Sequence, residues 1–117
     1  MFPKAFDRTF ELWRYSVGHA QLLLRSTKSD EWATRVDVGF KNVEYIQLPT
    51  LMNRLAIEVG TEADLPPQAR QALDMVGKTV FILSTDGVRG FVVAGYGGWI
   101  EDEGDYSDPS KALPDIG

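Results

Sequence analysis

Apolar and polar residues alternate with a period of two along much of the amino-terminal half. The alternation is clearest over residues 32–40, where every second side chain from Trp32 to Phe40 falls on one face. A two-residue period with aromatic and β-branched residues is typical of a β-strand. Further strands are predicted over residues 11–17, 20–27, 43–48 and 55–59. Lys41 and Asn42 fit a tight turn between strands, so we expect an antiparallel meander in this half of the chain.

Residues 20–27 need a separate explanation because they contain three consecutive leucines. Successive side chains of a strand point to opposite faces, so we expect apolar contacts on both faces there. A helix over residues 16–24 is the alternative, and Gly18 disfavours it.

The period changes to that of a helix after residue 64. One helical stripe is formed by Leu65, Ala69, Ala72, Leu73 and Val76. Asp64 fits an N-cap, Pro66 and Pro67 suit a first turn, and Gly77 suits the position after the last turn. The pattern predicts one helix near residues 66–76 that packs its apolar face on the sheet.

Two more strands are predicted over residues 78–84 and 88–100, joined by a turn at Asp86 and Gly87. Four glycines in the second of these strands indicate a bulge or a sharp bend. We therefore expect an α+β fold with a mostly antiparallel sheet of about six or seven strands, curved or sandwich-like, and one helix. Residues 1–100 would form a single globular domain, followed by an acidic extended tail over residues 101–117.

The net charge of −5 comes from that tail. It holds six acidic residues and one lysine, which leaves eleven acidic and eleven basic residues in the body of the chain. Nucleic-acid binding requires a clustered basic surface. We therefore expect no nucleic-acid partner. The acidic residues could bind a hard cation weakly, but their order does not match a calcium loop, so no metal site is predicted.

Several classes of protein are disfavoured by what the sequence lacks. It contains no cysteine, which argues against disulfides and thiolate chemistry and fits a reducing cytoplasm. The first residues lack the apolar region of a signal peptide, and the longest uncharged run is too short to span a bilayer. We therefore expect a soluble cytoplasmic protein without a membrane partner, and we expect no cofactor, because no phosphate-binding loop pattern is present.

Three polar residues are candidates for a ligand site. His19 is the sole histidine, and Arg25 and Arg35 lie on neighbouring predicted strands, where they could hold an anion or a carboxylate. Each also has a structural interpretation. His19 would be a hydrogen-bonded residue at a bend, and the two arginines would form cross-strand ion pairs on a solvated face.

Tyr96 and Trp99 are candidates for an interaction surface, because they stand among glycines near the edge of the predicted sheet. Exposed tyrosine and tryptophan are enriched at protein interfaces. The strand that carries them could pair with a second copy of the chain. We therefore expect a homodimer, and we leave open whether the surface also binds another protein.

Four stretches resemble those of small uncharacterised bacterial proteins: residues 12–19 (LWRYSVGH), 22–26 (LLLRS), 35–38 (RVDV) and 47–49 (QLP). The resemblance extends up to about residue 100. It implies a stand-alone bacterial protein, and that group has no activity to carry over. In composition the chain is also similar to the compact acidic immunity proteins of toxin systems, without a shared motif.

Three functions follow as hypotheses. The sequence shows no acid pair, metal triad or nucleophile–base pair, which favours a non-catalytic binding or interaction protein of unknown ligand. The second hypothesis is a small enzyme or ligand-binding pocket around His19, Arg25 and Arg35. The third is an immunity-type protein whose acidic tail binds a cationic toxin.

Overall fold

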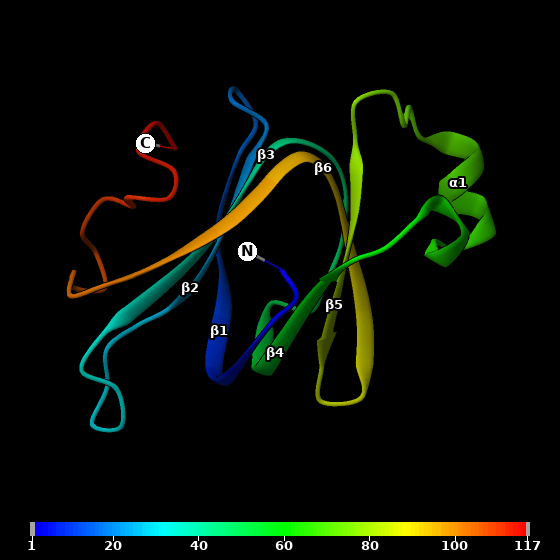
Figure 1. Ribbon diagram of the computed structural model, residues 1–117. Helices are drawn as coiled ribbons and strands as arrows, with labels where there is room; N and C mark the ends of the chain where they lie inside the picture. Colours follow the sequence, from blue (N-terminus) through cyan, green and yellow to red (C-terminus); the bar gives the residue numbers. More distant parts are fainter. Residues whose placement is uncertain (1, 117) are drawn as a thin grey trace.

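The protein is an antiparallel sheet of six strands that closes into a barrel in the order β1-β2-β3-β6-β5-β4 (Figure 1). This computed structural model describes residues 2–116. The strands are β1 (Lys4–Ser16), β2 (Gln21–Ser26), β3 (Arg35–Gln47), β4 (Leu51–Val59), β5 (Thr79–Thr85) and β6 (Val88–Asp102). A 3₁₀ turn, η1 (Glu62–Asp64), and one short helix, α1 (Pro67–Ala72), connect β4 to β5. The predicted antiparallel sheet with one helix is confirmed, but the fold is mostly β and the α+β label fits only roughly.

The predicted meander is right for β1, β2 and β3. It is wrong for β4, which follows β3 in the chain but does not pair with it. β1 pairs with β2, and β2 pairs with β3. β3 then pairs with β6, whereas β4 pairs with β1 and β5. This arrangement joins the two ends of the sheet, and closure removes the unpaired edges that an open sheet would expose.

The predicted turn at Lys41 and Asn42 is instead a bend inside β3. Asn42 has a φ of 54°, in the left-handed region that asparagine tolerates better than most residues. The register with β6 shifts just after it, between Val43 and Tyr45. The chain therefore changes direction without leaving the sheet, and two predicted strands form one long strand. The predicted turn at Asp86 and Gly87 is present, with φ values of 46° and 77°.

The predicted helix has the right position and the wrong length. α1 ends at Ala72, and Leu73 is already extended with φ −101° and ψ 143°. The carboxylate of Asp74 accepts a hydrogen bond from the Val76 N–H (3.1 Å), which favours a turn over another helical turn. Gly77 continues this turn with a φ of 71°.

The predicted N-cap of this helix belongs to the preceding turn. Asp64 is the last residue of η1, and its carboxylate accepts a hydrogen bond from the Thr61 N–H (2.8 Å). Arg89 of β6 donates to the same carboxylate (3.2 Å). The N-cap of α1 is Pro66.

The interior of the barrel is filled by apolar side chains. Its buried cluster consists of Phe6, Phe10, Leu22, Leu24, Val36, Val38, Phe40, Met52, Leu55, Ile57, Phe81, Leu83, Val92 and Ala94. Phe6 packs edge to face on Phe10, and Phe40 packs in the same way on Phe81, each with ring centroids 5.2 Å apart. A small barrel of this kind is a packed core, so binding surfaces have to be sought on its outside.

Two smaller apolar clusters cover opposite sides of the outer wall. On one side, the segment around α1 places Leu65, Leu73 and Met75 against Val80, Ile82, Phe91 and Val93 of β5 and β6. On the other side, the last residues of the chain place Leu113 and Ile116 against Leu23 and Trp13. Figure 1 shows α1 and the carboxyl terminus on these two sides. Both segments are therefore parts of the packed structure.

We expect Phe40→Ala to lower the free energy of unfolding by about 3–5 kcal/mol, because the ring is fully buried in the barrel interior. Urea unfolding followed by circular dichroism measures the change. Val76→Ala is the matched control, since its side chain is 82% exposed and its loss should cost less than about 0.5 kcal/mol. Equal effects of the two substitutions would contradict the assigned core.

Candidate functional site

The carboxyl-terminal residues fold back over the outer wall of β2 and β3. β6 includes Asp102, so the predicted tail begins inside the strand. Residues 103–116, named here the C-terminal segment, then turn onto the barrel (Figure 1). Its Ser110 and Leu113 are buried, and Leu113 lies directly over Gly39 of β3.

Arg35 of β3 is the main anchor of this segment. Its side chain is 1% exposed and forms a bidentate ion pair with Asp102, with N–O distances of 3.0 and 2.9 Å. The remaining N–H groups donate to main-chain carbonyl oxygens of Asp105 (3.0 Å), Asp108 (2.8 Å) and Pro109 (3.2 Å). The guanidinium group thus joins the end of β6 to the chain that follows it.

Arg25 of β2 is the second anchor. It forms a bidentate ion pair with Asp37 at 2.7 and 2.9 Å and donates to the Tyr106 carbonyl oxygen at 2.6 Å. The Trp13 ring lies 5.2 Å from its guanidinium carbon. Asp37 also approaches Arg35 at 3.9 Å. One buried carboxylate therefore lies between the two arginines.

The structure brings together two of the three residues predicted to form a ligand site. Arg25 and Arg35 lie on the same outer face, but they are buried under the C-terminal segment and not on a solvated face. Their partners are the carboxylates and carbonyl oxygens of this chain. His19 is exposed in the turn before β2, and about 13 Å of extended strand separates Gln21 from Arg25. Ligand binding by this trio stays a prediction.

The two predicted interface aromatics lie on opposite faces of β6. The Tyr96 side chain is 51% exposed on the outside, with the Lys41 Nζ 5.7 Å from its ring. Trp99 packs against Phe6 of the interior, with ring centroids 5.3 Å apart. Residues three positions apart in a strand face opposite ways, so the two cannot form one contact surface. Self-association through Tyr96 stays a prediction.

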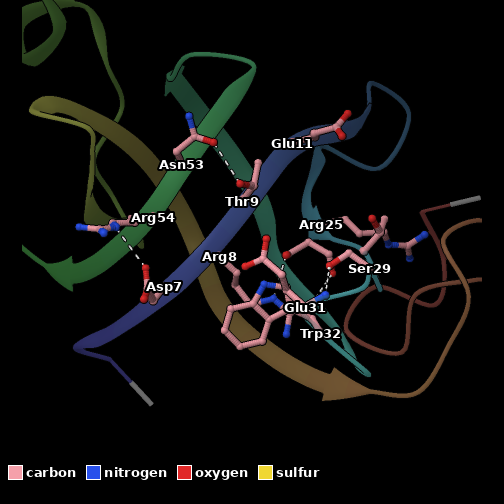
Figure 2. Close-up of a pocket in the computed structure, with 12 residues that line it drawn as sticks. Asp7, Arg8, Thr9, Glu11, Arg25, Ser29, Glu31, Trp32, Asn53 and Arg54 are labelled. Atoms are coloured by element: carbon pink, nitrogen blue, oxygen red, sulfur yellow. Dashed lines mark hydrogen bonds and ion pairs between the residues drawn. The ribbon is translucent and has the colours of Figure 1, made fainter.

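Sequence reasoning missed a polar hollow of about 420 Å³ between β1, β4 and the loop from β2 to β3 (Figure 2). It is lined by Asp7, Arg8, Thr9, Glu11, Arg25, Ser26, Thr27, Ser29, Glu31, Trp32, Asn53 and Arg54. The lining thus includes three arginines and three carboxylates, and of the arginines Arg25 directs its guanidinium group to Asp37 and the Tyr106 carbonyl oxygen. The only aromatic ring among these residues is Trp32.

Arg8 lies at the base of the hollow and is buried although it carries a charge. It donates to the Ser26 Oγ (2.8 Å) and to the Thr34 carbonyl oxygen (2.6 Å), and the Trp32 ring lies 4.8 Å from its guanidinium carbon. Burial lowers the pKa of the Arg8 guanidinium, and the Glu101 carboxylate, 3.9 Å away, partly offsets this effect. These bonds tie β1 to the loop that carries Trp32.

The sequence did contain one signal for Arg8. It stands between Phe6 and Phe10 at a position that the period-two pattern directs inward. A charged residue at an inward position needs polar partners, because burying an unpaired charge costs several kcal/mol or more.

The side of the hollow formed by β1 and β4 is held by two polar pairs. Thr9 Oγ1 donates to Asn53 Oδ1 (3.0 Å), and Asp7 pairs with Arg54 (3.1 Å). Figure 2 shows these pairs on one side and Arg8, Glu31 and Trp32 gathered on the other.

Glu11 and Glu31 contribute carboxylates to the lining. Within residues 2–116, neither side chain takes part in a hydrogen bond or an ion pair. The Glu31 main-chain N–H, by contrast, donates to the Ser29 Oγ (3.1 Å). The hollow therefore offers hydrogen-bond acceptors that the fold does not use.

Across residues 2–116, no group of three or more histidine, aspartate or glutamate side chains is arranged to hold a metal ion. None of the described helices has the length and apolar character needed to cross a membrane. Searches of family models, curated proteins and solved structures each found no match for this chain. Function is therefore inferred from the hollow and the C-terminal segment themselves.

Acid should loosen the C-terminal segment through Asp102. The hydrogen bond from Arg35 lowers the pKa of this carboxyl group, burial opposes that shift, and the Gly104 N–H adds to it. Because the folded-state pKa lies below the unfolded value of about 3.9, the ionised carboxylate stabilises the fold above that pH. This contribution is lost as pH falls through the folded-state pKa. Asp102→Asn should therefore flatten the acid limb of the stability profile, measured by urea unfolding between about pH 2 and 7.

Asp7→Asn is the matched control for this experiment. Asp7 also pairs with an arginine, Arg54, but both side chains are about four-fifths exposed. Exposed pairs contribute little, so this variant should keep the wild-type profile. If Asp102→Asn instead followed the wild-type curve in parallel, the assigned role of Asp102 would be wrong.

Enlarging Gly39 should detach the C-terminal segment without unfolding the barrel. A Cβ at this position would lie 2.7 Å from the Leu113 Cγ, too close for both to stay in place. We expect Gly39→Val to raise hydrogen exchange over residues 105–116 while the barrel strands stay protected. Gly18→Ala is the control, because a Cβ there meets no atom within 4 Å. Unchanged exchange in Gly39→Val would refute the packing of Leu113 on Gly39.

Proposed function

We propose that this protein is a non-catalytic binding protein that holds a small polar ligand in the hollow beside Trp32. The observation that carries the proposal is the hollow itself, in which one aromatic ring and a balanced set of charges surround about 420 Å³. That volume lies in the range of sites that accept small molecules.

The charges favour a ligand without net charge. Arg25 is already paired with Asp37, Arg54 with Asp7, and the Arg8 N–H groups with neutral oxygens. An anion would meet Glu11 and Glu31, and a cation would lie beside Arg8. A molecule that carries both donors and acceptors, such as a polyol or a zwitterion, meets neither penalty.

Binding is favoured over catalysis by the state of the polar groups. A general base must lie within hydrogen-bond reach of the proton that it removes. Ser29 lies in the hollow, but its Oγ accepts from the Glu31 N–H (3.1 Å), and the sole histidine, His19, is in the turn before β2. The lining therefore supplies hydrogen bonds and a ring surface, which are the elements of recognition.

The proposal predicts that uncharged or zwitterionic probes shift the indole N–H resonance of Trp32. Methyl α-D-glucopyranoside and L-serine serve as such probes, and citrate and spermidine as charged comparisons. Trp32→Ala lacks the reporting indole, so binding to this variant is measured by isothermal titration calorimetry. It should be about tenfold weaker, since losing a ring contact worth about 1.4 kcal/mol corresponds to that factor. Glu31→Gln, on an exposed loop, tests the same site without disturbing the core.

Tyr96→Ala is the matched aromatic control, because Tyr96 is exposed and lies outside the hollow. It should leave all four titrations unchanged. The proposal fails if none of the probes moves the Trp32 resonance at millimolar concentration, or if Trp32→Ala and Tyr96→Ala behave alike. Tighter binding of citrate or spermidine would overturn the expected ligand charge.

A further inference from the structure

We infer that the outer wall of β2 and β3 is a peptide-binding site, which the chain's own C-terminal segment occupies. A partner that fits this site carries an acidic tight turn followed by an aliphatic residue. The inference concerns the face beneath the C-terminal segment and is independent of the ligand proposed for the hollow.

The first support is that the wall recognises main chain. Arg25 and Arg35 donate to four carbonyl oxygens of the segment, those of Asp105, Tyr106, Asp108 and Pro109. Main-chain carbonyls are present in any peptide, so these bonds depend on the path of the chain more than on its side chains. A site that binds main-chain carbonyl oxygens in this way accepts any peptide whose backbone forms the same turn.

The second support is that the wall is a built site. The side chains of Arg25 and Arg35 are 2% and 1% exposed. Bidentate ion pairs with Asp37 and Asp102, respectively, fix their orientation. Fixed donors lose little entropy when a peptide binds, which favours affinity. All of these anchors except Asp102 belong to β2 and β3, and Asp102 is the last residue of β6. The site is thus complete without the C-terminal segment.

The third support is a seat for one aliphatic side chain. Gly39 lies on this face of β3, and its missing side chain leaves room for Leu113 on the wall. Leu113 is fully buried there and contacts Leu23. A leucine of a partner peptide would fit the same place.

The acidic turn supplies the specificity. Lys28, in the loop after β2, pairs with the Asp105 carboxylate at 3.3 Å. The Asp108 carboxylate accepts from the Asp105 N–H at 2.9 Å and closes the turn that presents its carbonyls to Arg35. The preferred partner therefore has aspartates three residues apart and a leucine about five residues later, as in this chain.

The tether explains why the site is closed to other peptides. Residues 103–116 follow β6 directly, so the segment is presented at an effective concentration of about millimolar or more. A peptide in solution must compete with this concentration. Weakening the internal segment should therefore open the wall.

The test uses a fluorescent synthetic peptide of residues 103–116 and full-length proteins. Leu113→Asp places a charge in the apolar seat and should release the internal segment. We expect this variant to bind the peptide at least tenfold more tightly than the wild type, by fluorescence anisotropy. A peptide with Asp in place of Leu113 should not bind. If Leu113→Asp fails to fold, Ile116→Asp, at the edge of the same cluster, is used instead.

The double variant Gly39→Val, Leu113→Asp is the matched control. Its internal segment is released, but the valine occupies the seat that the peptide needs. It should lose the binding gained by Leu113→Asp. The inference is overturned if the folded Leu113→Asp protein binds no more tightly than the wild type, or if the double variant binds as well as the single one.

Discussion

Two guanidinium groups on the outer wall stay buried only while carboxylate and carbonyl oxygens surround them. Removing one partner of a buried ion pair costs about 3–5 kcal/mol, because the other charge is left unpaired in the protein. Asp37 supplies one such partner for Arg25, and Asp102 supplies one for Arg35. The last carbonyl partners come from the C-terminal segment. The path of the final residues is therefore set by the need to keep two charges solvated by the protein.

A third buried arginine meets the same constraint in a different way. Arg8 is held mainly by neutral oxygens of Ser26 and Thr34, and its nearest carboxylate, Glu101, is half exposed. Its bonds fix the loop that carries Trp32 and so determine the shape of the hollow. The two surfaces proposed for binding thus depend on the same physical feature, which is a largely buried guanidinium group that needs oxygen partners from the protein.

The sequence revealed local structure better than long-range structure. Alternation located part of every strand but missed the first half of β1 and the start of β4, and the pair Asp86 and Gly87 located a hairpin. Both signals depend on neighbouring residues. Strand order, barrel closure and the burial of the arginines depend on partners far along the chain, such as Arg35 and Asp105, which no local pattern records. The opposite orientations of Tyr96 and Trp99 were predictable from their odd spacing. The acidic composition of the last residues suggested solvation and concealed the contribution of their main-chain carbonyls.

The packing of Leu113 on Gly39 has a consequence for how this chain can vary. These positions lie far apart in the sequence and share one small volume on the barrel wall. A larger residue at one position is compatible with the fold only with a smaller one at the other. Amino-acid substitution at either position is thus constrained by the residue at the other. The carboxyl-terminal residues therefore evolve as part of the barrel.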